Sequence, residues 1–302
     1  MEGKVSNAAQ IAYVRRYTLT EGQEAGLKIT EVDNGKLRFL LNESRALDIA
    51  QLWHGGKNVS FVSKIGMNAQ TTPFLSRFEG GMLYTCGLES VGGREGFELH
   101  GTLHTTPARV TRAECTQDEI VVEAETLCAQ LFGGELVFRR RIVTKIGSDA
   151  LEITDTLENR AYRDEQYCLL YHVNLGYPML DEGAEIIAEE KCVSPRTEWA
   201  QKHLGDLKRI PAPVANQFEM CYFVDMKKSG ASLVNKKIGK AFTLDWSQET
   251  LPQFILWKSM AHGDYALGFE PATTKLDGDF AYKTVKARSC VQFSLRMSVT
   301  EL

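Results

Sequence analysis

The chain has 302 residues, a length that suits one large β domain or two small domains. Its formal net charge of −4 leaves no basic surface, so nucleic acid is not an expected partner. The seven cysteines are scattered and contain no C-x-x-C pair, which argues against a disulfide framework and a zinc site. We find no signal peptide and no apolar run of membrane-spanning length, so we expect a cytoplasmic protein without a membrane partner.

Alternation of apolar and polar residues, the pattern of strands with one buried face, dominates the chain. The first 30 residues are expected to form an N-terminal extension or an edge strand. Residues 45–52 have helix-like apolar spacing, but their β-rich surroundings favour a strand equally. The alternation further predicts strands over four segments: 120–127, 136–144, 151–157 and 291–299.

These segments together predict an all-β chain. No linker or repeat divides it, so we expect a single domain over residues 1–302, built as a large antiparallel β-sandwich. The basic run Arg139–Arg141 lies inside one predicted strand, and we interpret it as a largely solvated strand face.

Two glycine-rich regions, 77–101 and 263–278, interrupt the alternation. Glycine clusters in a β protein mark loops that bend sharply or lie close to a ligand. The functional site is therefore expected in or beside these regions.

Two histidines, His100 and His104, lie four residues apart in the first of these regions. Gly101 disfavours a helix that would place both on one face, and no H-E-x-x-H signature is present. In an extended segment both side chains could line a polar cleft. Together with a carboxylate they could also hold a metal ion, although the expected chemistry requires no metal. The alternative is a pair of loop histidines that hydrogen-bond to the backbone, and the sequence leaves it open.

A second constellation joins residues almost a hundred positions apart. His172 and Asn174 share one face of an extended segment, and Glu270 ends a short apolar strand before Pro271. A histidine with a carboxylate can serve as a general acid/base pair. A buried histidine or a strand-end glutamate alone more often has a structural role. The acid/base hypothesis is favoured only if the two strands lie side by side.

Four segments, in order and spacing, resemble the aldose 1-epimerase (galactose mutarotase) superfamily, and more closely an uncharacterised branch of it. They are Gly80–Gly93, Leu99–Ala108, His172–Gly183 and Tyr265–Thr273. The resemblance extends over about residues 35–300. It implies a large antiparallel sandwich, the galactose mutarotase-like supersandwich, with a polar cleft on one sheet.

The resemblance also implies a mechanism. Glu270 would take the proton of the anomeric hydroxyl, and His172 would protonate the ring oxygen. The ring then opens, the C1–C2 bond rotates and the ring closes with the roles reversed. At one pH the base must be ionised and the acid protonated, so we expect the nearby carboxylate to raise the pKa of the histidine.

Further residues are expected to bind the substrate. Arg77 and His100 resemble family positions that hold sugar hydroxyls, and Asn174 is a further contact. His104 is included because it shares a strand face with His100 in an extended segment. The candidate for a binding aspartate is Asp225, and Lys258 is expected to contact an acidic or phosphorylated part of the substrate.

The leading hypothesis is a sugar mutarotase, an isomerase of carbohydrate metabolism that acts without a cofactor on a free or acidic monosaccharide. One alternative is a carbohydrate-binding or sensing protein that keeps the cleft but not turnover. Another is an isomerase or lyase acting on a keto sugar or uronate with the same residues. The expected partner is a monosaccharide or sugar derivative, and a homodimer is left open.

Overall fold

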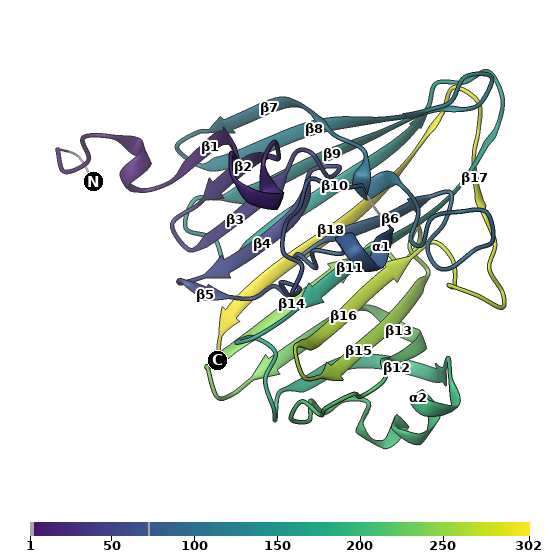
Figure 1. Cartoon of the computed structure of the whole chain (residues 1–302). Helices are drawn as coiled ribbons and strands as arrows, with labels where there is room; N and C mark the ends of the chain where they lie inside the picture. The colour runs from purple at the N-terminus through teal and green to yellow at the C-terminus, as the bar shows by residue number, and fades with distance from the viewer. Residues whose placement is uncertain (1–2, 72) are drawn as a thin grey trace.

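A computed structural model describes residues 3–71 and 73–302. The N-terminal part forms a five-stranded antiparallel sheet, drawn purple to blue in Figure 1. In spatial order its strands are β1 (Tyr13–Thr18), β2 (Lys28–Asp33), β3 (Leu37–Asn42), β4 (Asp48–His54) and β5 (Lys57–Asn58). The predicted edge strand of the N-terminal segment is therefore present as β1.

The rest of the chain builds a much larger antiparallel sheet that extends across the molecule (Figure 1). Its main path is β17 (Lys283–Val285), β11 (Glu165–Leu175), β16 (Asp264–Ala272), β15 (Gln253–Ala261), β13 (Met220–Asn235), β14 (Lys240–Trp246), β18 (Cys290–Glu301), β10 (Ala150–Asn159), β9 (Glu135–Lys145), β8 (Glu119–Ala129) and β7 (Arg109–Cys115). Two further strands join it off this path: β12 (Glu185–Pro195) pairs with β13, and β6 (Tyr84–Leu88) pairs with β11.

Helices are few and short. The α-helices are α1 (Phe74–Arg77) and α2 (Glu198–Lys202), and the 3-10 turns are η1 (Ala8–Gln10), η2 (Gly22–Glu24), η3 (Leu103–Thr105) and η4 (Leu204–Asp206). Among the described residues, none of these helices is long and apolar enough to cross a bilayer.

The predicted all-β class is confirmed. The four alternating segments fall within β8, β9, β10 and β18, and residues 48–54 form strand β4 rather than a helix. Apolar side chains from both sheets meet in one core, with Phe39 and Leu52 from the small sheet and Phe138 and Ile153 from the large sheet. Burial of these side chains is the main favourable term in folding. The assignment of the whole chain to one domain stays a prediction.

The interpretation of Arg139–Arg141 as a solvated face is wrong for its central member. Successive side chains on β9 point to opposite faces, so Arg140 faces the small sheet while Arg139 and Arg141 face out. Arg140 is 2% exposed and binds Asp48 of β4 and Asp155 of β10. This buried ion cluster, Arg140 with its two carboxylates, links the two sheets across the core.

Candidate active site

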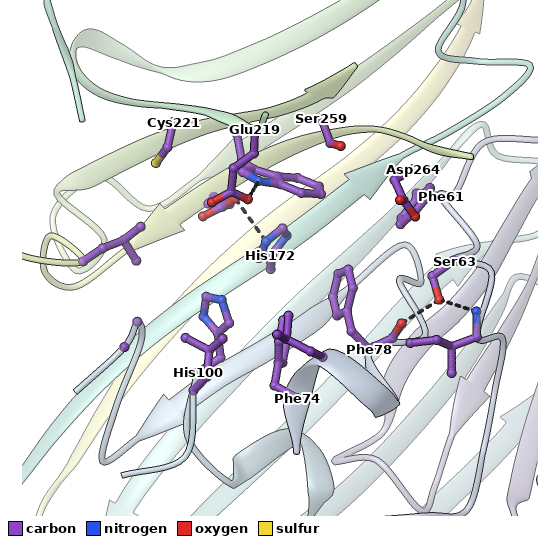
Figure 2. A pocket seen from close by; sticks show the side chains of 18 of the residues that line it. Phe61, Ser63, Phe74, Phe78, His100, His172, Glu219, Cys221, Ser259 and Asp264 are labelled. Carbon is purple, nitrogen blue, oxygen red and sulfur yellow. Dashed lines mark hydrogen bonds and ion pairs between the residues drawn. The ribbon is translucent and has the colours of Figure 1, made fainter. Parts of the chain in front are cut away.

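A cavity of about 570 Å³ opens on the face of the large sheet formed by β11, β13, β15 and β16. This volume is within the range of small-molecule sites. The sheet contributes His172, Cys221, Trp257 and Glu270 to its lining. Figure 2 shows His172 at the centre, between Glu219 on one side and His100, Phe74 and Phe78 on the other.

The register of two strands brings the predicted acid/base pair together. Strands β11 and β16 run antiparallel with Leu170 opposite Ala272 and Val173 opposite Phe269, which sets His172 against Glu270. The His172 Nε2 atom lies 3.2 Å from Glu270 Oε1. The two atoms are in contact, but they are not aligned as a hydrogen bond. The structure therefore brings these two predicted residues together. Glu270 Oε1 and His172 Nδ1 both lack a hydrogen-bond partner among the described residues.

Space for this contact exists because residue 268 has no side chain. A Cβ atom on Gly268 would lie 2.7 Å from Glu270 Oε1 and 3.2 Å from His172 Cε1. The first distance is shorter than two non-bonded heavy atoms tolerate, so a larger residue would displace the carboxyl group.

Burial sets the protonation of the pair. Loss of solvent around Glu270 raises its pKa well above the usual value; the Glu219 carboxylate adds to this rise, and Arg196 opposes it. Burial, with a smaller effect of His100, lowers the pKa of His172 to about 3. The expectation that the carboxylate raises the histidine pKa is therefore wrong, because the effect of burial is larger. Both shifts favour the neutral forms of the pair, a protonated Glu270 and a neutral imidazole.

One wall of the cavity is aromatic. Phe74 and Phe78 come from α1 and the residue that follows it, and His172 lies 5.8 Å from the Phe78 ring and 5.3 Å from the Trp257 ring between ring centroids. His100 also lines the cavity, as predicted, with its ring 5.8 Å from that of His172. Removal from water lowers the pKa of His100 to about 4. Aromatic faces and neutral imidazoles suit a ligand with an apolar face and hydroxyl edges.

The opposite wall carries polar residues that the sequence analysis did not assign to the site. Arg196 follows β12, and Glu219 precedes β13. The Glu219 carboxylate accepts a hydrogen bond of 2.7 Å from Trp257 Nε1. Neither residue lies in a motif, and only the pairing of β12 with β13 brings both of them to the cavity.

Two predicted binding residues lie elsewhere. Lys258 follows Trp257 on β15 and therefore points to the opposite face of the strand. It is 2% exposed, and its ammonium group donates to the carbonyl oxygens of Asp206, Leu207 and Arg209. Asp225 is an exposed residue of β13 outside the cavity lining. The prediction of substrate contacts for both residues is contradicted by these positions.

Three more predicted residues lie behind the cavity rather than in its lining. Arg77 is buried on α1 and contacts Glu98 at 3.4 Å. His104 stacks on Tyr84 and binds Asp48, with 2.6 Å between Nδ1 and Oδ2. Asn174 is fully buried and donates to the His172 carbonyl oxygen. None of these three side chains belongs to the lining of the cavity.

The alternative of a metal held by His100 and His104 is not supported, because the two histidines point into different surroundings. His100 faces the cavity, whereas His104 is held by Asp48. Over residues 3–71 and 73–302, no three His, Cys, Asp or Glu side chains gather in a geometry that would hold a metal ion.

With the fold and cavity described, comparison with known proteins defines the class. The chain has the galactose mutarotase-like fold, which it shares with aldose 1-epimerases. It belongs to the family described as "Domain of unknown function (DUF4432)", whose model matches residues 24–288. No curated protein matches the sequence.

Solved structures similar to this chain support the fold. A candidate aldose 1-epimerase from Klebsiella pneumoniae has a TM-score of 0.84 at 22% identity, covering 95% of this chain and 83% of that chain. A galactose mutarotase-like protein from Clostridium acetobutylicum has a TM-score of 0.70 at 14% identity, over 97% and 100% of the two chains. A galactose 1-epimerase from Lactobacillus acidophilus has a TM-score of 0.67 at 11% identity, over 96% and 99%. At these identities the similarity concerns the fold alone.

Proposed function

We propose that the protein is a sugar mutarotase that interconverts the anomers of a monosaccharide. The observation that carries this proposal is the His172–Glu270 contact of 3.2 Å in the lining of a cavity of about 570 Å³, which is large enough to admit a monosaccharide. The shared fold with aldose 1-epimerases supports it.

The chemistry follows from the proton count of the pair. Ring opening removes a proton from the anomeric hydroxyl and adds one to the ring oxygen, so it needs one base and one acid. In the proposed cycle, binding of the cyclic sugar first moves the shared proton from Glu270 to His172. Glu270 as carboxylate then takes the proton of the anomeric hydroxyl, and His172 as imidazolium gives a proton to the ring oxygen. The open aldehyde is then left with neutral Glu270 and neutral His172, the form that burial of the two groups favours.

Ring closure reverses both transfers after rotation about C1–C2. Because the pair holds one proton in either form, no proton is exchanged with solvent during the cycle. The rings of Phe78 and Trp257 flank His172 and give the reacting groups an apolar border.

The test is a screen of anomeric exchange by NMR against a panel of free aldoses, keto sugars and uronates. Wild-type protein is expected to accelerate exchange of at least one sugar. Glu270→Gln should lower that rate by about 10²–10⁴-fold, because it keeps the shape but removes the proton-accepting group. Sugar binding without exchange across the panel, or full activity of the variant, would contradict the proposal.

A further inference from the structure

A cation that no motif marked lies on the cavity wall. Arg196 directly follows β12, and about one third of its side chain is exposed. Its backbone N donates to the Cys221 carbonyl oxygen at 2.9 Å, and its Nε donates to Asp277 Oδ2 at 2.5 Å. Asp277 therefore holds the Nε side of the guanidinium group, and Cys221 holds the backbone of the residue.

The two terminal NH₂ groups of the Arg196 guanidinium make no hydrogen bond to the described residues. In the part of the chain that the structure describes, no residue accepts a hydrogen bond from Nη1 or Nη2 of Arg196. Two terminal NH₂ groups in a fixed plane form a donor pair that matches the two oxygens of a carboxylate. Arg196 thus presents a preformed anion-binding group to the cavity.

We propose that Arg196 binds a carboxylate of the substrate and that the cavity accepts acidic monosaccharides, with hexuronates as the substrate class. This inference rests on the proposed mutarotase function, because it places the carboxylate relative to the reacting ring. In a hexuronate the carboxylate is attached to C5, the atom next to the ring oxygen. A residue that binds this carboxylate must therefore lie close to His172, which protonates the ring oxygen in the proposed mechanism.

The electrostatics agree with this placement. Arg196 lines the same cavity as Glu270 and His100, and its positive charge lowers the pKa of both groups. The other cation of the cavity, Lys64, is already paired with Asp264 at 2.7 Å between Nζ and Oδ2. Arg196 is paired as well, with Asp277, and it differs from Lys64 in its planar pair of terminal NH₂ groups, which matches a carboxylate.

Two acidic neighbours limit the charge that the ligand can carry. Asp277 already contacts Arg196, and Glu219 lies on the same wall. One guanidinium can bind two carboxylates in this protein, since Arg140 does so between Asp48 and Asp155. Because these two carboxylates already lie near one guanidinium, a ligand with one negative charge is repelled less than a ligand with two, so a carboxylate monoanion fits this wall better than a phosphate dianion.

The experiment measures anomeric exchange for matched pairs of sugars with the full-length protein. D-glucuronate is compared with D-glucose, D-galacturonate with D-galactose, and glucose 6-phosphate represents the dianion. We expect kcat/KM for the better uronate to exceed that of its neutral partner at least tenfold. Arg196→Gln should reduce this ratio at least tenfold, and Arg196→Lys should restore part of it because it keeps the charge near Asp277.

Arg112→Gln is the matched control, because Arg112 pairs with Glu114 on the exposed strand β7, away from the cavity. It should leave the ratio unchanged, and thermal melting should verify that all variants fold. A wild-type preference for neutral sugars or for the phosphate, or an unchanged ratio in Arg196→Gln, would overturn the inference.

Calorimetric binding separates this inference from the proposed function. If no sugar is exchanged but uronates bind wild type at least tenfold more tightly than Arg196→Gln, the mutarotase proposal fails and the carboxylate anchor stands. If sugars are exchanged without any preference for the acid, only the anchor fails.

Discussion

At the residue scale, the contact between the two proton-transfer groups depends on a missing side chain. Gly268 shares strand β16 with Glu270, and its backbone conformation is accessible to alanine. Gly268→Ala should therefore fold normally but push the Glu270 carboxyl group away from His172. A displacement on the order of 1 Å can cost about 10²-fold in rate, so we expect kcat/KM for anomeric exchange to fall by tenfold or more.

Gly205→Ala is the matched control, since a Cβ at that position meets nothing within 4 Å. It should leave exchange unchanged. Wild-type exchange in a folded Gly268→Ala protein would show that the carboxyl position does not limit the reaction.

The low pKa of His172 predicts a specific pH dependence of stability. A histidine in the unfolded chain binds a proton below about pH 6.5, whereas folded His172 remains neutral down to about pH 3. The unfolded state therefore binds more protons in this window, and the free energy of unfolding falls as pH decreases through it. Between pH 7 and pH 4.5 this one group should cost about 2 kcal/mol.

His172→Gln should remove that contribution, so its stability should decline less steeply than that of wild type over this range. Urea unfolding at pH 7, 5.5 and 4.5 measures the difference. His262→Gln, at an exposed position, serves as the control and should follow wild type. Parallel curves for wild type and His172→Gln would refute the buried neutral imidazole.

At the element scale, the buried ion cluster joins strands that belong to different sheets. Arg140 on β9 lies between Asp48 of β4 and Asp155 of β10, and Tyr171 of β11 also donates to Asp155 at 2.8 Å. β11 also carries His172, so the ion cluster helps to hold in place one of the strands that line the cavity.

Arg140→Met should leave two buried carboxylates without their cation and reduce the free energy of unfolding by about 3–5 kcal/mol. Arg141→Met is the neighbouring control, because Arg141 is an exposed residue that pairs with Glu123 at 3.1 Å. Exposed pairs contribute about 0–1 kcal/mol, so this variant should stay near wild type. Equal losses measured by denaturant unfolding would contradict the assignment of the two faces of β9.

At the scale of the whole molecule, the sequence predicted the features that leave a local pattern, namely the strands and the motifs of the candidate site. Period-two alternation identified four strands of the large sheet, β8, β9, β10 and β18, and the order of the motifs brought His172, Glu270 and His100 into one hypothesis. The sequence alone also led to two errors. It does not show which face of β15 carries Lys258, so Lys258 was expected to contact the substrate. It does not show which face of β9 is buried, so Arg140 was expected to be solvated.

The polar wall of the cavity could not be predicted for a different reason. Arg196 and Glu219 lie just beyond the ends of strands, and their positions depend on the pairing of β12 with β13 rather than on local sequence. The protonation of the pair likewise depends on burial by chain segments that are distant in sequence, such as α1 and the loop that carries His100. Long-range contacts of this kind leave no periodic signal in the chain.

The central claim is that His172 and Glu270 act as one proton-transfer unit. Its most direct test is the anomeric exchange rate, measured by NMR on a sugar that wild type converts, for Glu270→Gln, His172→Gln and the double variant. Residues that act as a unit are non-additive, so each single variant should lose about 10²–10⁴-fold and the double variant should lose no more. Losses that multiply in the double variant, or a single variant that retains the wild-type rate, would contradict the account.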